Sequence, residues 1–115
     1  MSEPSIFSRI LAKEIPSEII AETENAFAIR DIHPQAPVHL LVIPKSQEYR
    51  NVVELAAGDP DLLAELIGLA NSLAVEHGGG DFRLVFNTGP DAGQTVFHVH
   101  AHVLAGELEE KTLGA

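Results

Sequence analysis

Three histidines alternate near the end of the chain, within the segment GQTVFHVHAHVLAG. Successive side chains of a β-strand point to opposite faces, so residues two apart share a face and lie about 6 to 7 Å apart. The imidazoles of His98, His100 and His102 are therefore predicted to form one row. The residues predicted to face the other way, into a core, are Val99, Ala101, Val103 and Leu104.

A row of imidazoles could bind a metal ion, attack a phosphorus atom or remain a solvated cluster. Zinc accepts histidine nitrogens, and His39 could supply a further ligand. The outer rings of the row would be about 13 Å apart, whereas each Zn–N bond spans about 2 Å, so at most two of the three could reach one ion. The row also lacks a nearby Cys, Asp or Glu.

Phosphorus chemistry accounts for the neighbouring residues as well as for the row. Imidazole is a nucleophile at neutral pH, because much of it is unprotonated near its pKa of about 6.5. The turn TGPDAGQ, with Gly89 and Gly93, precedes the row and can aim backbone N–H groups at an anion. These features favour a phosphorus reaction over a metal site or a solvated cluster.

Composition limits the class of protein. The chain has 115 residues, of which 45% are hydrophobic, and this predicts a single domain over residues 1–115. Its net charge of -10 without a basic stripe argues against binding a nucleic acid polymer. The absence of cysteine excludes disulfides and thiolate metal sites. No apolar run is long enough for a membrane span, and a cytoplasmic protein is expected.

The periodicity of apolar residues predicts an α+β protein with a mostly antiparallel sheet. A short helix is expected around residues 6–11 and a long one from Pro60, with Asp59 as N-cap and Gly78 just past its end. Strands are expected in EIIAET and NAFAIRD, which form a hairpin, and in VHLLVIP, DFRLVFN and the histidine segment. His39 shares a face with Leu41 and Ile43.

The motif HVHAHVL resembles the signature of the histidine triad (HIT) superfamily of nucleotidyl hydrolases and transferases, most closely its branch of histidine triad nucleotide-binding (Hint) proteins. Three further segments support the resemblance in the family's order: IFSRILAKEIPSEII, RDIHPQAPVHLLVIPK and FNTGPDAGQTVFHVHAH. His102 stands where the transferase branch typically carries glutamine, which favours a hydrolase.

The resemblance implies a five-stranded antiparallel sheet with one long and one short helix, and a homodimer with a ten-stranded sheet. It implies a purine nucleotide-binding hydrolase of the nucleoside phosphoramidase type, with no cofactor and no metal. Two alternatives are a nucleotide-binding regulatory protein with vestigial catalysis and a dinucleoside polyphosphate hydrolase. The implied partners are a purine nucleotide or nucleoside phosphoramidate and a second copy of the chain.

The resemblance also assigns roles to individual residues. His100 would be the nucleophile and form a covalent nucleotidyl-histidine, His98 and His102 would contact phosphate or leaving group, and His39 would help to orient the nucleophile. Asp31 would hold the ribose hydroxyls, although on spacing alone it could equally initiate a turn. The other residues implied in nucleotide binding are Phe7, Ile10 and Ile32 around the purine, with Asn87, Gly93, Gln94 and Thr95 near the phosphate.

Two features depart from the family pattern. Some members carry a zinc site with cysteines near the first helix, where this chain has Ser5 and Ser8. Hint proteins often end in a tail with a tryptophan that shapes the leaving-group pocket, whereas this chain ends GELEEKTLGA. The departures concern the choice of substrate more than the chemistry.

Overall fold

One antiparallel sheet of five strands organises the protein, in the order β1-β2-β3-β5-β4. The structure is a computed structural model that describes residues 3–108. The strands are β1 (Ile19–Glu22), β2 (Ala26–Arg30), β3 (Val38–Pro44), β4 (Arg83–Val85) and β5 (Ala101–Ala105). The helices are α1 (Ile6–Leu11), α2 (Val52–Gly58) and α3 (Pro60–Gly78), with a short 3-10 turn, η1, at Pro90–Ala92.

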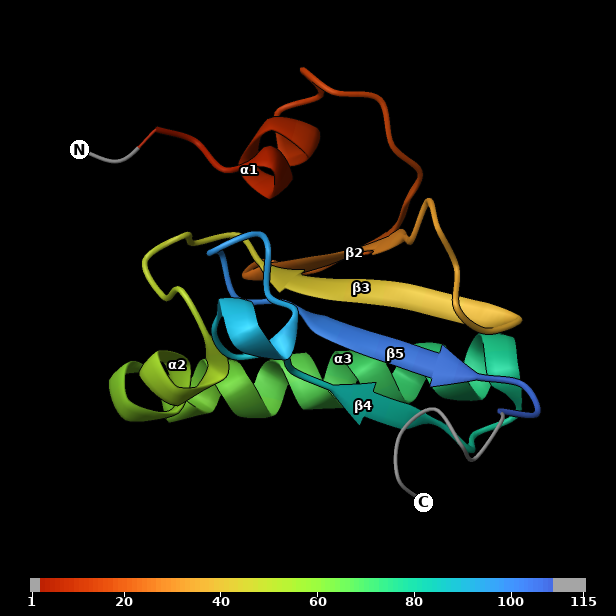
Figure 1. Cartoon of the computed structure of the whole chain (residues 1–115). Helices are drawn as coiled ribbons and strands as arrows, with labels where there is room; N and C mark the ends of the chain where they lie inside the picture. Colours follow the sequence, from red (N-terminus) through yellow and green to blue (C-terminus); the bar gives the residue numbers. More distant parts are fainter. Residues whose placement is uncertain (1–2, 109–115) are drawn as a thin grey trace.

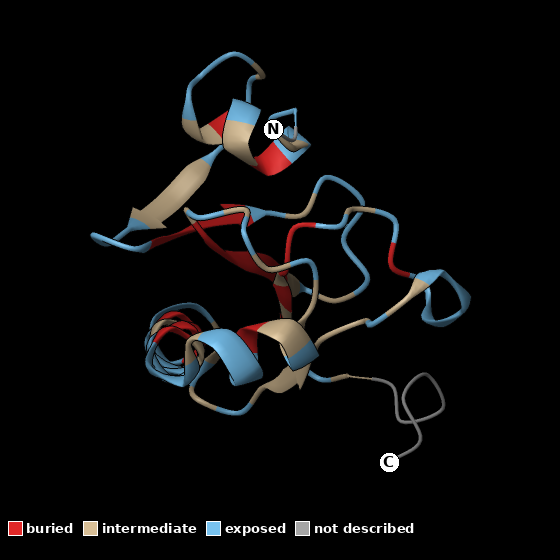
Figure 2. Ribbon diagram, turned by 90° about the vertical axis from the view of Figure 1, so that its left-hand side faces the viewer, coloured by how far each residue is buried: buried red, intermediate tan, exposed pale blue. Residues whose placement is uncertain are grey.

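The helices lie on opposite faces of the sheet (Figure 1). On the side of α2 and α3, a large apolar core includes Val99, Ala101 and Val103, as the sequence predicts. On the side of α1, a smaller core joins this helix to β2 and β3 through Phe7, Ile10, Phe27, Ile29, Leu41 and Ile43. Figure 2 shows buried backbone in the sheet between the two helical layers. The face toward α1 also carries the histidines.

Helix boundaries follow from capping residues. The Asp59 carboxylate accepts the N–H of Leu62 at 3.1 Å, and Pro60 occupies the first position of α3, as predicted. The predicted C-terminus is one residue too early, because Gly78 is still helical and Gly79 takes the left-handed conformation, with φ of 79°. Helix α2, capped by Asn51, was not predicted. It is short, and α3 follows it after one residue.

Neighbouring strands place the histidines in register. His39 on β3 pairs with Leu104 on β5, and Leu41 pairs with His102. Since side chains opposite each other on paired strands share a face, Leu104 lies on the histidine side. Its predicted place in the opposite core is wrong, because the face alternates along β5.

The histidine segment is only partly a strand. β5 begins at Ala101, so His98 and His100 precede it, and the N–H of Val99 donates to the carbonyl of Tyr49 at 3.0 Å. β4 is likewise shorter than the predicted strand over residues 81–87. Across residues 3–108, no helix has the length and apolar character that a bilayer crossing requires.

Candidate active site

The ring of His100 is held in one tautomer by the backbone. Its Nδ1 lies 2.9 Å from the carbonyl oxygen of His98. A carbonyl can only accept, so Nδ1 carries the hydrogen and Nε2 of the neutral ring keeps its lone pair. The edge of this ring contacts Phe7 on α1, with ring centroids 4.9 Å apart. His100 thus has the protonation pattern of a nucleophile that attacks through Nε2.

The ring of His98 is buried inside the protein. The residue is 0% exposed, and both ring nitrogens have partners inside the protein. Nε2 lies 2.7 Å from the carbonyl oxygen of Pro44 and Nδ1 lies 2.5 Å from Oγ of Ser5. The donor and the acceptor of the His98 ring are thus both used inside the protein, and the predicted contact of this ring with phosphate or leaving group remains a prediction.

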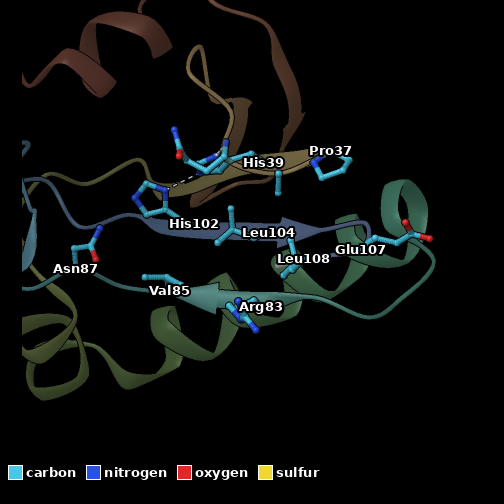
Figure 3. Close-up of a pocket in the computed structure, with 11 residues that line it drawn as sticks. Pro37, His39, Arg83, Val85, Asn87, His102, Leu104, Glu107 and Leu108 are labelled. Atoms are coloured by element: carbon cyan, nitrogen blue, oxygen red, sulfur yellow. Dashed lines mark hydrogen bonds between the residues drawn. The ribbon is translucent and has the colours of Figure 1, made fainter. Parts of the chain in front are cut away.

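His39 and His102 form a pair across β3 and β5. Nε2 of His39 lies 2.9 Å from Nδ1 of His102 and 3.3 Å from a carboxylate oxygen of Asp31. Nδ1 of His39 accepts the N–H of Gln35 at 2.9 Å, so the hydrogen of the neutral ring is on Nε2. Nδ1 of His102 then accepts from His39, which leaves its own Nε2–H as a donor (Figure 3).

The same hydrogen bonds argue against a metal ion at this pair. One nitrogen or oxygen from each of Asp31, His39 and His102 lies within 4.8 Å of the others, which is close enough to consider shared coordination. Coordination by Nε2 of His39 would require its hydrogen to move to Nδ1, where the Gln35 N–H already donates. The donor set therefore suits a hydrogen-bonded chain better than a cation.

All four imidazoles are held in the neutral form. Burial lowers the pKa of His39, His98 and His100 from the usual value. The pKa of His102 falls to about 4, chiefly through burial and then through the neighbouring His100 and His39. Neutral rings at pH 7 keep a lone pair for attack on phosphorus, and this is the state in which His100 can act.

The lowered pKa values predict acid-sensitive stability. Unfolded histidines titrate near 6.5, so the unfolded state binds more protons than the folded state between pH 6.5 and the lower folded pKa values. The free energy of unfolding should fall as pH drops from 6.5 to 4, by on the order of 3 kcal/mol for His102 alone. Urea denaturation across this range measures the slope. A His102→Gln variant with an unchanged slope would contradict the assignment.

A cavity of about 670 Å³ opens beside the His39–His102 pair, between the loop before β3 and the sheet edge at β4 (Figure 3). Asn87 and Arg83 also line it. Nη1 of Arg83 is buried and has no hydrogen-bond partner within the part of the chain that the structure describes. An unpaired guanidinium nitrogen, an amide and an imidazole N–H together suit an anionic ligand.

The three residues predicted around the purine do not share one environment. Phe7 and Ile10 are buried in the core under α1, where Phe7 also touches His98 and His100. Ile32 is 82% exposed in the loop after β2. The exposed side chain of Ile32 can therefore cover a ligand, whereas Phe7 and Ile10 expose only a small part of their surface to one.

Asp31 initiates a turn, which is one of the two roles that its position in the sequence suggests. One carboxylate oxygen accepts the N–H of His33 at 2.8 Å, and the other lies beside His39. Each carboxylate oxygen has a second lone pair, so the predicted ribose contact remains a prediction.

The turn before the histidines makes hydrogen bonds within the protein. The N–H of Gly93 donates to the carbonyl of Pro90 at 3.0 Å, and its predicted contact with phosphate remains a prediction. Gln94 is 3% exposed, and its amide bonds to Gly89, Arg50 and Val96. Thr95 is exposed and faces a separate open groove near Ser5 and Gln47. The turn is thus stabilised by its own hydrogen bonds.

Sequence reasoning missed the hydrogen bonds that surround His98. Ser5 was noted only for the cysteine it replaces, and Gln47 was not singled out. Gln47 Oε1 accepts both the N–H of Ser5 and the hydroxyl of Ser8, each at 2.8 Å. The N-cap position of Ser5, immediately before an apolar helix, is a signal that the sequence does contain.

Residues 12–109 match the family model described as HIT domain. A HIT-like protein of Synechococcus elongatus is 46% identical over 107 residues, covering 92% of this chain and 93% of that protein. An adenylylsulfatase of Arabidopsis thaliana is 39% identical, covering 90% of this chain and 71% of that protein. The structure of a HIT family hydrolase from Clostridium thermocellum superposes with a TM-score of 0.86 and 38% identity, covering 100% and 97% of the two chains. The chain therefore belongs to the HIT family, as its motifs predict.

Proposed function

We propose that the protein is a hydrolase of purine nucleoside phosphoramidates or related nucleotidyl compounds, acting through a covalent intermediate on His100. The observation that carries this proposal is the tautomer of His100, with Nδ1–H bonded to a carbonyl and Nε2 without a hydrogen-bond partner among residues 3–108. The names of two relatives, an adenylylsulfatase and a HIT family hydrolase, support hydrolysis, and the first also names an adenylyl substrate.

The first step of the reaction forms one bond and breaks another. Nε2 of His100 donates its lone pair to phosphorus, and the bond from phosphorus to the leaving nitrogen or oxygen breaks with its electron pair. The leaving nitrogen takes up a proton from solvent as it departs. Water then attacks the phosphorus of the nucleotidyl-histidine and gives up one proton to solvent. The bond from phosphorus to Nε2 breaks, its electron pair returns to Nε2, and the nucleoside monophosphate is released from the neutral His100.

His102 and His39 would stabilise the charge on the phosphoryl oxygens. The Nε2–H of His102 is the donor at the end of the chain that runs from the Gln35 N–H through His39, and Asp31 lies beside the shared Nε2–H of His39. A negative charge that develops near this N–H is stabilised most strongly in a partly buried site. Asn87 and Arg83 extend the same donor surface along β4.

The nucleoside would bind between α1 and the loop after β2. Ile32 would cover the purine against the edges of Phe7 and Ile10, and Asp31 would accept the ribose hydroxyls. Thr95 faces the separate groove near Ser5 and Gln47, whereas Asn87 lines the cavity beside His102. With Gly93 and Gln94 bonded internally, we assign them to shaping the turn, and Asn87 to direct contact.

A turnover screen tests the proposed function. Purified protein is incubated with adenosine phosphoramidate, adenylyl sulfate and a dinucleoside polyphosphate, and release of AMP is followed with and without a chelator. We expect phosphoramidate turnover that the chelator leaves unchanged, because His100 supplies the nucleophile. Binding of AMP without turnover of any substrate would favour the regulatory alternative. Activity that is lost on chelation and restored by zinc would overturn the metal-free mechanism.

We also propose that the protein is a homodimer. α3 leaves Ile67 and Val75 partly exposed, and a Cβ added at Gly68 would meet no atom within 4 Å, so this stretch can approach a second copy closely. Light scattering at micromolar concentration should give twice the mass of the chain. In Gly68→Lys, the measured mass should fall to that of one chain while the protein stays folded. A wild-type mass of one chain would contradict the proposal.

A further inference from the structure

We propose that Ser5 is a positioning residue for the reaction, which holds the nucleophile His100 in place through the ring and backbone of His98. The inference rests on the proposed function and adds to it a residue from outside the row of histidines. Ser5 lies before α1 and 93 positions away from His98. Its contact with His98 therefore depends entirely on the packing of α1 against the sheet.

The direction of the Ser5–His98 hydrogen bond follows from the other side of the ring. Nε2 of His98 lies 2.7 Å from the Pro44 carbonyl, which can only accept, so this nitrogen carries the hydrogen. Nδ1 then has a lone pair, and the hydroxyl of Ser5 donates to it at 2.5 Å. The alternative acceptor for that hydroxyl, Oγ of Ser8, is farther away at 3.3 Å.

The position of the His98 ring affects the position of His100 through the backbone. The ring is hydrogen-bonded on both sides, so the His98 residue has little freedom to rotate. Its carbonyl oxygen is the acceptor that holds Nδ1–H of His100. Phe7, two residues after Ser5, contacts both rings, with centroid distances of 5.6 and 4.9 Å. The beginning of α1 therefore determines where Nε2 of His100 lies.

Ser5 is itself held by two neighbours. Its N–H donates to Oε1 of Gln47 at 2.8 Å, and its Oγ accepts the N–H of Ser8 at 3.1 Å. Gln47 also donates from Nε2 to the carbonyl of Glu3 at 2.9 Å. Because Pro44 and Gln47 both belong to the end of β3 and the segment after it, the network joins α1, β3 and the histidine segment at one point.

Loss of the Ser5 hydroxyl would remove one of the two hydrogen bonds that fix the His98 ring. The Pro44 carbonyl still accepts from Nε2–H, so the tautomer is kept, but Nδ1 loses its donor and the ring is held on one side only. The ring can then turn about the remaining bond, and the carbonyl that holds His100 moves with it. A displacement of about 1 Å at a reacting group can cost on the order of 10²-fold in rate.

Four variants separate positioning from helix stability. Ser5→Gly removes the hydroxyl but retains a residue that is well tolerated as an N-cap. Ser5→Ala removes both hydroxyl and cap. Ser5→Thr restores a hydroxyl. Ser8→Ala is the matched control. It removes a hydroxyl of α1 that bonds to Gln47, and it leaves the Ser5–His98 bond intact.

In Ser5→Gly and Ser5→Ala, we expect kcat for phosphoramidate turnover to fall about tenfold or more while the Kd for AMP changes by less than about twofold. Ser5→Thr should recover most of the loss, and Ser8→Ala should retain wild-type kcat. An equal loss in Ser8→Ala and Ser5→Gly would overturn the proposal, since loosening of α1 would then explain both.

The ring nitrogens provide a readout that needs no activity. Nitrogen-15 NMR of the wild-type protein should show His98 protonated at Nε2 and His100 protonated at Nδ1. Ser5→Gly should shift the resonance of the unprotonated Nδ1 of His98, because its lone pair loses the hydroxyl donor, and Ser8→Ala should not. Unchanged ring nitrogens in Ser5→Gly would overturn the proposal. If the wild-type protein turned over no substrate, the proposed function would fail, and the NMR comparison would still decide the role of Ser5.

Discussion

His100→Ala should abolish turnover of an adenosine phosphoramidate, with a decrease in kcat/KM of at least about 10³-fold. The substitution removes the only imidazole of the triad whose Nε2 lone pair is left free by the hydrogen bonds of the described residues. The neighbouring ring of His98 cannot replace it, because it is buried and bonded at both nitrogens.

AMP binding should survive the His100→Ala substitution. The nucleoside contacts proposed for Asp31 and Ile32 do not involve the nucleophile, so Kd should change by less than about fivefold. His77→Ala provides a matched control on the exposed end of α3 and should retain full turnover. A mildly quenched reaction of the wild-type protein should contain a nucleotidyl adduct on His100. Wild-type turnover in His100→Ala, or an adduct on His98, would contradict the mechanism.

His98→Ala should lower the free energy of unfolding by about 3 kcal/mol, which is the second large effect we expect. The substitution leaves a cavity where a fully buried ring packs against Phe7, and it removes the partner of the Pro44 carbonyl and of the Ser5 hydroxyl. Chemical denaturation measures the change.

An exposed histidine provides the comparison for His98. His33→Ala, in the loop after β2, should change the free energy of unfolding by less than about 0.5 kcal/mol. If His98→Ala instead kept wild-type stability while losing turnover, its ring would have to act on the substrate, as the sequence analysis expected. The structure places the ring in the interior, and we propose that His100 and His102 make the catalytic contact.

The sequence predicted the parts of the site that depend on strand periodicity. Alternation along the chain places His100 and His102 on one face and Val99 and Val103 on the other, and the same rule brings His39 to that face from β3. The long helix was recognisable because Asp59 and Pro60 form a standard N-terminal signal. Its last turn was not, since Gly78 and Gly79 are equally suited to end it.

The parts that could not be predicted depend on contacts between distant segments. Periodicity cannot show that α1 covers His98, because the Ser5–His98 bond joins residues 93 positions apart. It also cannot show whether a backbone N–H is free. Glycines in a turn suggest an anion cradle, but the N–H of Gly93 is used by Pro90 in a 3-10 turn. Pattern identifies which side chains share a face, whereas packing determines which of their atoms remain available.

The strand order has a consequence for the way the protein is made. β5 is the last of the five strands in the sequence, yet it lies between β3 and β4 in the sheet. A chain that emerges from the ribosome N-terminus first can pair β1, β2 and β3 early, but β3 and β4 both keep an open edge until β5 arrives. His100 and His102 arrive with that strand. The step that pairs β5 with β3 and β4 thus also assembles the histidines, so the proposed nucleotide site of a nascent chain is incomplete until its sheet is complete.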